Sequence, residues 1–219
     1  MDRRLLLLVI AVVALVGVVN ATVYAYRWIT GTVSIAGQGQ ATGAACTGFY
    51  SYAAQPDISG YLPPAGTNYN AKTYGSYEIS VTPIYVVCQW TNETNGKQVQ
   101  LYEGIDVSIP ITIGSWYIQD FYGFGYNGTT GDPTVNVWFR VEETNLSSLV
   151  TTAYLIIRTP DGTKVGSLDL TSTGNMIGSF TLSPGSGWRL DLYINATYTG
   201  TAWFKVGVYV SQSTETPRP

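Results

Sequence analysis

The side chains with the most definite chemistry in this sequence are its two cysteines, Cys46 and Cys88. In an exported protein, a pair of cysteines forms a structural disulfide by default. The bridge would close a loop of about 40 residues and would stabilise the fold by roughly 3–4 kcal/mol on the chain-entropy model. Two buried thiols that never meet are the alternative. The sequence predicts the disulfide, provided that the chain is exported.

In the part of the chain predicted to be exported, four Asn-x-Ser/Thr sequons offer a second kind of chemistry, the attachment of N-linked sugar. Their acceptor residues are Asn92, Asn127, Asn145 and Asn195. Asn127 lies in a predicted turn and Asn195 on the polar face of a predicted strand, which are the surroundings that an attached glycan requires. Unmodified surface asparagine is the alternative at each position.

Residues for catalysis or for metal binding are scarce. The chain has no histidine, which is the usual general base and metal ligand. Glu142 and Glu143 are adjacent in a predicted strand, so their carboxylates point to opposite faces. Asp120, Asp132 and Asp161 lie in turns, where Asp usually accepts local backbone hydrogen bonds, and calcium binding there is a weaker alternative. We predict no enzymatic activity, no cofactor and no metal site.

The composition indicates a β-rich surface protein. Charged residues make up 11% of the 219 residues, while the chain has 17 tyrosines and 24 glycines. Such a composition favours strands over helices. The net charge is −3, and no cluster of Lys and Arg follows residue 4, so the sequence predicts no nucleic-acid partner.

Residues 1–21 are typical of a secretion signal. A basic start is followed by the apolar run Leu5–Val19, and Val19-Asn20-Ala21 fits a cleavage site before Thr22. A retained membrane anchor is the alternative, since about 20 residues suffice to cross a bilayer. We expect cleavage, secretion, and contact with the membrane only during export.

The remainder reads as strands that alternate apolar and polar residues and are separated by Gly, Pro, Asn and Asp. This pattern predicts an antiparallel β-sandwich of jelly-roll or Greek-key type over residues 32–210, followed by a polar tail at 211–219. Ser76–Trp90 is expected to be a strand at an edge or with a bulge, because it contains Pro83.

Four further segments have distinct predictions. Thr134–Glu143 is a strand with Val135, Val137, Phe139 and Val141 on one face, and Lys97–Gly114 reads as two short strands. Leu149–Leu170 and Trp188–Val210 each read as a β-hairpin.

The stretch after the predicted cleavage site is itself a strand. Its aliphatic positions include Val23, Ala25 and Ile29, and Gly31 marks a break before the next strand, Thr32–Ala36. Residues 22–31 have no turn that would fold them back, so they are predicted to be a donor strand that completes the sheet of a neighbouring subunit. The donor-strand residues are Val23, Tyr24, Ala25, Tyr26, Arg27, Trp28 and Ile29. An ordinary first strand that pairs within its own sandwich is the alternative.

The signal ending "VVNA", the strand "TVYAYRWITGTVSIAG" and an all-β remainder with sequons and few lysines resemble the archaeal bundling-pilus subunits of the TasA-like group. That group is similar to a bacterial biofilm-fibre protein and to archaeal thread and cannula subunits. The resemblance covers the whole chain but has no diagnostic motif. It implies an extracellular filament at the cell surface, which would bundle laterally and support cell adhesion and biofilm.

The expected function is therefore that of a pilus subunit that polymerises head to tail with identical subunits. Neighbouring filaments and cell-surface glycans are further partners to consider. The alternative is a monomeric cell-surface or carbohydrate-binding β-sandwich, in which exposed aromatic residues would stack on sugar. The aromatic candidates are Trp116, Tyr117, Tyr122, Tyr126 and Trp203.

Overall fold

The computed structural model describes residues 46–51, 72–74, 77–91, 96, 98–212 and 214–217. The described elements are strands and one short 3-10 helix. They are β1 Cys46–Tyr50, β2 Lys72–Tyr74, β3 Tyr77–Glu78, β4 Ser80–Thr91, β5 Gln98–Ile111, β6 Gly114–Asn127, β7 Val135–Thr144, η2 Leu146–Ser148, β8 Val150–Arg158, β9 Lys164–Asp169, β10 Met176–Leu182, β11 Gly187–Ala196 and β12 Gly200–Ser211. Among the described residues, no helix is long and apolar enough to cross a membrane.

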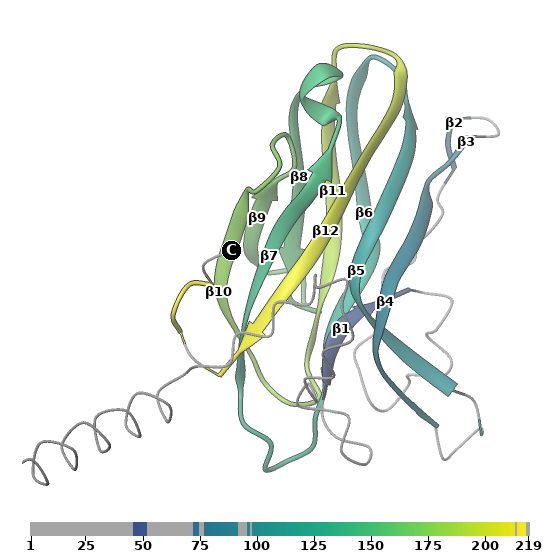
Figure 1. Cartoon of the computed structure of the whole chain (residues 1–219). Coiled ribbons are helices and arrows are strands. Elements are labelled where there is room, and N and C mark those ends of the chain that lie inside the picture. The colour runs from purple at the N-terminus through teal and green to yellow at the C-terminus, as the bar shows by residue number, and fades with distance from the viewer. Residues whose placement is uncertain are drawn as a thin grey trace, which may run out of the picture.

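Eight of the strands are arranged as a jelly roll (Figure 1). The antiparallel pairs are β5 with β12, β6 with β11, β7 with β10, and β8 with β9. One layer has the order β10-β7-β12-β5, and the other has the order β6-β11-β8-β9. This nesting of four antiparallel pairs defines the jelly-roll arrangement. The predicted all-β antiparallel fold is confirmed.

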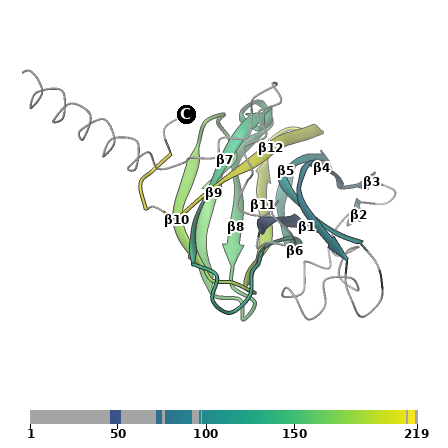
Figure 2. The same cartoon turned by 60° about the horizontal axis from the view of Figure 1, so that its bottom comes forward.

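The two layers join into a nearly closed sheet. On one side, β1 pairs with β6 from Cys46 to Tyr50 and meets β5 at Phe49–Tyr102. On the other side, β9 and β10 face each other. The Phe180 ring and the Cδ1 methyl group of Ile177 pack over Gly166. The remaining long strand, β4, lies outside this ring on the edge of β5 that is opposite to β12 (Figure 2).

The core fills the space between the two layers. Val135, Val137, Phe139 and Val141 are each at most 1% exposed, which confirms the face predicted for this strand. Aromatic rings extend across the core, because Phe124 lies 5.2 Å from Phe49 and 5.1 Å from Phe139 between ring centroids. Such edge-to-face pairs contribute about 0.5–1.5 kcal/mol each beyond the area that they bury.

The predicted hairpin at Trp188–Val210 is wrong, although both of its strands form. β11 pairs with β6 and β8, whereas β12 pairs with β5 and β7. The turn between them crosses from one layer to the other, so the two aliphatic faces meet across the core instead of lying side by side. Alternation in the sequence is the same for both arrangements, because each buries one face of each strand.

The prediction of two strands in Lys97–Gly114 is also wrong, since Gln98–Ile111 is one continuous strand. Gly104 lies within this strand and allows the close approach of β12. A Cβ atom at residue 104 would lie 2.8 Å from the backbone oxygen of Val206 in β12. The predicted hairpin at Leu149–Leu170 is confirmed as β8 and β9.

We predict that Gly48→Ala lowers the free energy of unfolding by about 1–3 kcal/mol, the usual cost of overpacking. A Cβ atom at residue 48 would lie 2.7 Å from the backbone oxygen of Tyr102, so β1 would have to move away from β5. Gly200→Ala is the control, because its nearest neighbour would be the Leu149 side chain at 3.4 Å. Urea denaturation measures both, and equal stability of the two variants would contradict the prediction.

Candidate functional site

The strands that end the sheet are the places where a strand from another molecule could add. In the described chain these strands are β9, β10 and β4. The edges of β9 and β10 face each other, and Phe180 fills the space over Gly166 between them. β4 pairs with β5 from Ser80 to Thr91 and has no second partner among the described strands. Its outer edge is therefore the candidate site for assembly.

The first half of β4 departs from regular strand geometry. Pro83 has no backbone N–H to donate, and Tyr85 has a φ of +47°, in the left-handed region that non-glycine residues rarely adopt. A bulge follows between Val86 and Cys88, which pair with Tyr102 and Leu101. Proline and bulges at a sheet edge hinder pairing with other chains. These features discourage indiscriminate pairing from Pro83 to Cys88. The sequence predicted an edge strand or a bulge for this segment, and the structure has a bulge between Val86 and Cys88 in a strand with no second partner among the described strands.

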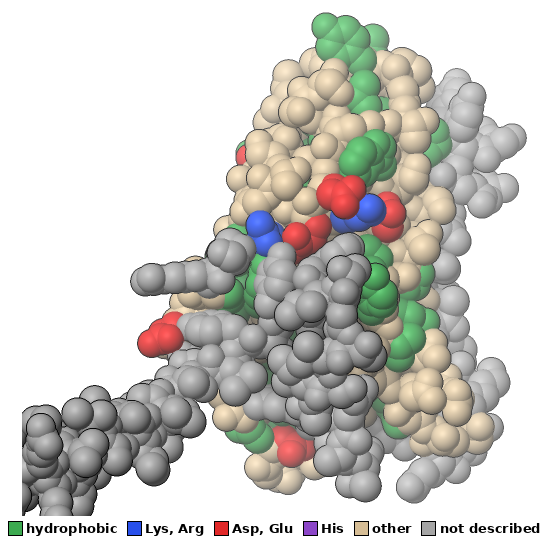
Figure 3. Space-filling model, in the orientation of Figure 1, with side chains coloured by type: hydrophobic (Ala, Val, Ile, Leu, Met, Phe, Trp, Pro, Cys, Tyr) green, Lys and Arg blue, Asp and Glu red, His purple; other side chains and the backbone are tan. Residues whose placement is uncertain are grey.

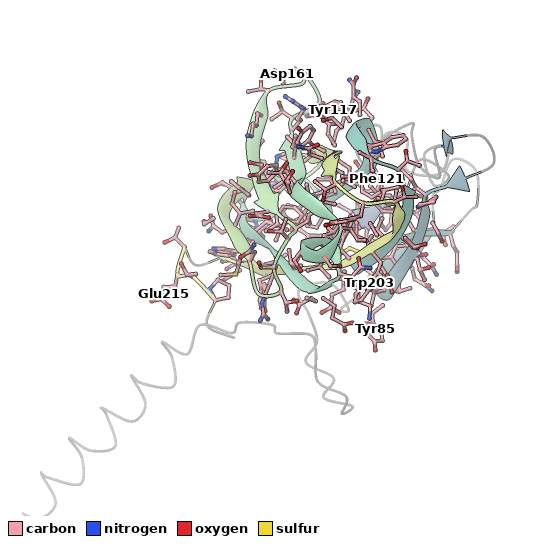
Figure 4. All side chains as sticks on the ribbon, turned by 90° about the horizontal axis from the view of Figure 1, so that it is seen from above. Tyr85, Tyr117, Phe121, Asp161, Trp203 and Glu215 are labelled. Atoms are coloured by element: carbon pink, nitrogen blue, oxygen red, sulfur yellow. A yellow bond between two sulfur atoms is a disulfide. The ribbon has the colours of Figure 1, made fainter. Side chains whose placement is uncertain are left out.

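Two large apolar side chains of β4 face solvent. Tyr85 is 59% exposed and Val86 is 47% exposed. Seen from above in Figure 4, Tyr85 projects outward at the margin of the molecule. An edge strand with exposed apolar side chains is a place where a strand of another chain could pair.

A second, small apolar cluster lies where β4, β5 and β1 meet. Its buried members are Cys46, Tyr50, Val99 and Leu101, and three partly buried residues of β4 pack against them: Val87, Cys88 and Trp90. Burial raises the pKa of the Tyr50 phenol well above its usual range, while the positive charge of Arg189 opposes this shift. This cluster is separate from the main core and is less completely covered on its β4 side.

Cys46 and Cys88 form a disulfide in this cluster, as the sequence predicts. Their Cα atoms lie 6.4 Å apart, within the usual range for the bond. The bridge ties β1, which belongs to one layer through β6, to β4, which belongs to the other layer through β5. It therefore fixes the position of β4 relative to Cys46, where the described part of the chain begins.

The predicted donor-strand residues lie outside the described residues, as do the signal segment and Thr32–Ala36. The same is true of Asn92. The structure therefore describes only the candidate acceptor, the outer edge of β4, and not the donor strand itself.

The other three predicted glycan acceptors lie in different surroundings. Asn127 is at the end of β6 and is partly exposed. The Asn195 side-chain oxygen accepts a hydrogen bond from Ser115 at 3.3 Å. The Asn145 amide donates to the backbone oxygen of Thr201 at 3.0 Å and accepts from the backbone N–H of Trp203 at 2.7 Å. Glycosylation at each position stays a prediction, and at Asn145 a sugar would share the amide nitrogen with a structural hydrogen bond.

The aromatic residues considered for sugar stacking do not form one platform. Tyr122 and Tyr126 are buried, and the Trp116 indole donates to the backbone oxygen of Thr112 at 2.9 Å. Tyr117 and Trp203 lie on opposite sides of the jelly roll (Figure 4). The residues that the alternative function would need are thus spread over both layers.

A polar cluster around Asp191 was not foreseen from the sequence. The Asp191 carboxylate is fully buried and accepts hydrogen bonds from Arg158 Nε at 2.7 Å, from the backbone N–H of Asp120 at 2.8 Å, and from the Tyr117 hydroxyl. Partial burial, followed by this bond to Asp191, raises the pKa of Tyr117. Alternation placed Asp191 on the polar face of its strand but did not indicate that it would be covered.

The three aspartates considered for calcium each have a protein partner, and Asp120, predicted in a turn, lies within β6. Asp120 pairs with Arg189 at 3.3 Å, Asp132 accepts from the Thr129 N–H at 2.7 Å, and Asp161 accepts from the Thr163 N–H at 3.2 Å. Two local hydrogen bonds, from Thr159 and then Thr163, lower the pKa of Asp161. Within the described ranges, no three acidic or cysteine side chains come together as a metal site.

Comparison with known proteins adds no relative. No family model matches the sequence, and no curated protein matches it significantly.

Proposed function

We propose that this protein is the structural subunit of an extracellular filament, in which the N-terminal strand of each mature subunit completes the sheet of the next. The observation that carries the proposal is the outer edge of β4, which pairs with no second strand among those described and belongs to a 12-residue strand with two exposed apolar side chains. A donor needs such an acceptor, and main-chain ladder bonds together with alternate side chains would supply register and affinity.

The predicted donor and the described acceptor complement each other chemically. Val23, Ala25 and Ile29 alternate along the donor, and each large aliphatic side chain that becomes buried contributes roughly 1.5–3 kcal/mol before the cost of ordering is subtracted. The contact joins two different surfaces, so it is heterologous and propagates into a filament. A role in adhesion and biofilm, glycosylation, and lateral bundling belong to the same proposal.

One end of the jelly roll has exposed apolar side chains. This surface is available for contacts between neighbouring filaments or between subunits of one filament. Ile113, in the β5–β6 turn, is 71% exposed, and Tyr198, in the β11–β12 turn, is 63% exposed. These turns lie together at the top of Figure 1, where Figure 3 shows hydrophobic atoms at the surface. Below them the outer surface carries charged pairs such as Lys205–Glu143 at 3.0 Å.

Deletion of residues Thr22–Thr30 after the signal tests the proposal. We expect the deleted protein to be secreted and to keep its jelly roll, because the deletion lies outside all described strands. It should form no filaments in electron micrographs, whereas the full-length mature chain should form them. Circular dichroism of both proteins controls for folding, and filaments of the deleted chain would refute the donor role.

A further inference from the structure

We propose that N-linked sugar at Asn195 stacks on a row of tyrosines on the outer face of the β6-β11-β8-β9 layer. The inference rests on one part of the proposed function, the glycosylation of a secreted subunit, and deepens it. It selects one acceptor among the three sequons that the structure describes, and it names the surface on which the attached sugar lies.

The tyrosine row contains one residue from each of three neighbouring strands. Tyr193 of β11 pairs with Tyr117 of β6 and with Tyr154 of β8, so the three residues lie side by side across the sheet. The neighbours of Tyr193 along β11, Leu192 and Ile194, belong to the main core. Because side chains alternate along a strand, Tyr193 and its two partners lie on the outer face.

The rings of the tyrosine row are ordered and partly open to solvent. Tyr117 is 51% exposed, and Tyr154 and Tyr193 are partly exposed. The rings of Tyr154 and Tyr193 are nearly parallel, with an interplanar angle of 15° and centroids 6.5 Å apart. The Tyr117 hydroxyl donates to Asp191 and accepts from Arg158 Nη2 at 3.2 Å. These two hydrogen bonds hold the third ring in place from strands of the same layer.

Asn195 lies beside the tyrosine row on the same face. It follows Tyr193 by two residues in β11, a distance of about 7 Å along a strand, and it pairs with Ser115 and Thr152. Its side-chain oxygen accepts from the Ser115 hydroxyl at 3.3 Å. Its amide nitrogen, the atom that would carry the sugar, donates to no protein atom among the described residues. A sugar at this nitrogen would begin next to Tyr193 and would break no hydrogen bond of the described fold.

A pyranose ring and a tyrosine ring are chemically suited to this contact. The C–H groups on one face of the sugar are slightly positive, and the face of an aromatic ring is negative. Stacking also removes the apolar surface of both rings from water. The hydroxyl groups at the rim of the sugar would lie near Ser115 and Thr152, whose own hydroxyl groups donate and accept hydrogen bonds.

The other two described acceptors lack an aromatic residue at the corresponding position. Asn127 follows Gly125 by two residues, and this glycine has no side chain. Asn145 follows Glu143 by two residues, and its amide nitrogen already donates a structural hydrogen bond. The structure therefore favours Asn195 as the acceptor whose sugar is held against the protein.

A thermodynamic cycle tests the contact. Wild type, Asn195→Gln, Tyr193→Ser and the double variant are secreted by the cells that produce the protein, and the same four chains are made in a host that attaches no N-linked sugar. Peptide mass spectrometry should find sugar on residue 195 of the secreted wild type. With sugar, Asn195→Gln should lower Tm by about 2–4 °C, the order expected for one aromatic contact in a domain of this size. This decrease should disappear in the Tyr193→Ser background.

Two controls separate the sugar from the side chains. In the host without N-linked sugar, the effect of Asn195→Gln should be the same with either residue at position 193. Asn127→Gln is the matched variant in the secreted protein, and its effect should not depend on Tyr193. Should Tyr193→Ser fail to fold, NMR of the secreted wild type provides the test. The ring currents of the tyrosine row should move the C–H resonances of the first sugar upfield from their positions in the unfolded glycopeptide.

Four results would overturn the inference. They are the absence of sugar from residue 195, an effect of Asn195→Gln that is equal in both Tyr193 backgrounds, the same dependence on Tyr193 in the host without sugar, and sugar resonances that match those of the unfolded glycopeptide. The filament is tested separately by electron microscopy. If the secreted chain forms no filaments but its sugar stacks on Tyr193, the filament proposal fails and this inference stands.

Discussion

Asp191→Ala is expected to lower the free energy of unfolding by about 3 kcal/mol. Removing one member of a buried ion pair costs about 3–5 kcal/mol, and the lower end applies because Arg158 is 30% exposed and water can solvate its guanidinium. The substitution also takes the acceptor away from the backbone N–H of Asp120 and from the Tyr117 hydroxyl.

The loss extends to the core through the bulge that Asp191 supports. Leu190 and Leu192 pair with Tyr122 and Ile118, so three residues of β6 lie opposite Asp191 alone. Asp120, in the middle of this bulge, has a φ of +50°. The bulge breaks the alternation of β6, and Phe121 and Tyr122 therefore both enter the main core although they are consecutive.

Urea denaturation followed by tryptophan fluorescence measures the effect, with Asp191→Asn as the matched control. Asparagine keeps an acceptor for the Asp120 N–H and loses only the charge, so we expect it to cost about 1–2 kcal/mol. A loss below about 1 kcal/mol for Asp191→Ala would show that the cluster contributes little.

Asp191→Ala should also change the pKa of Tyr117. Its pKa is raised in the folded protein, so the contribution of its protonated form to stability is present below the unfolded value of 10 and is lost as pH rises through the folded value. Asp191→Ala removes the second cause of this shift. The Tyr117 pKa, followed by NMR, should move downward towards 10.

Replacing both cysteines, Cys46→Ser with Cys88→Ser, is expected to lower the free energy of unfolding by about 4 kcal/mol. The sequence separation is 42 residues, and the chain-entropy model gives this value for a loop of that length. The local effect should be larger than the global one, because β1 has only five residues and the small cluster only four buried side chains.

Hydrogen exchange locates the effect of the double substitution. We expect exchange to accelerate in β8 and β11, which lie away from the bridge, only through the loss of global stability, and to accelerate most in β1 and β4. Wild-type protein treated with a reductant should behave in the same way. Uniform acceleration over all strands, or a loss of less than about 1 kcal/mol, would contradict the prediction.

The sequence predicted individual strands better than their partners. Val135 to Val141 alternate strictly, and their burial follows from that pattern alone. The pairing of β11 with β6 could not be predicted, because Leu190 would face the core equally well in a hairpin with β12. The continuous strand Gln98–Ile111 was predicted as two strands for a related reason, since the close approach of β12 at Gly104 leaves no mark in the local sequence.

The candidate site was predictable only in part. The two cysteines predicted a disulfide and Pro83 predicted an edge strand or a bulge. The structure confirms the disulfide and has a bulge in β4. The burial of Asp191 depends on a bulge in a strand that lies about 70 residues away in the chain. No local pattern at residue 191 encodes that geometry, so an isolated polar position was the natural interpretation.

The place of β12 in the sheet has a consequence for biosynthesis. This last strand lies between β5 and β7, so a nascent chain that ends before residue 200 lacks the middle of one layer. The layer β10-β7-β12-β5 therefore cannot be completed until nearly the whole polypeptide has been made, and long-range pairing of this kind is slow. A polypeptide whose fold is completed only by its last strand stays extended for longer, and an export channel for unfolded chains can transport it in that state.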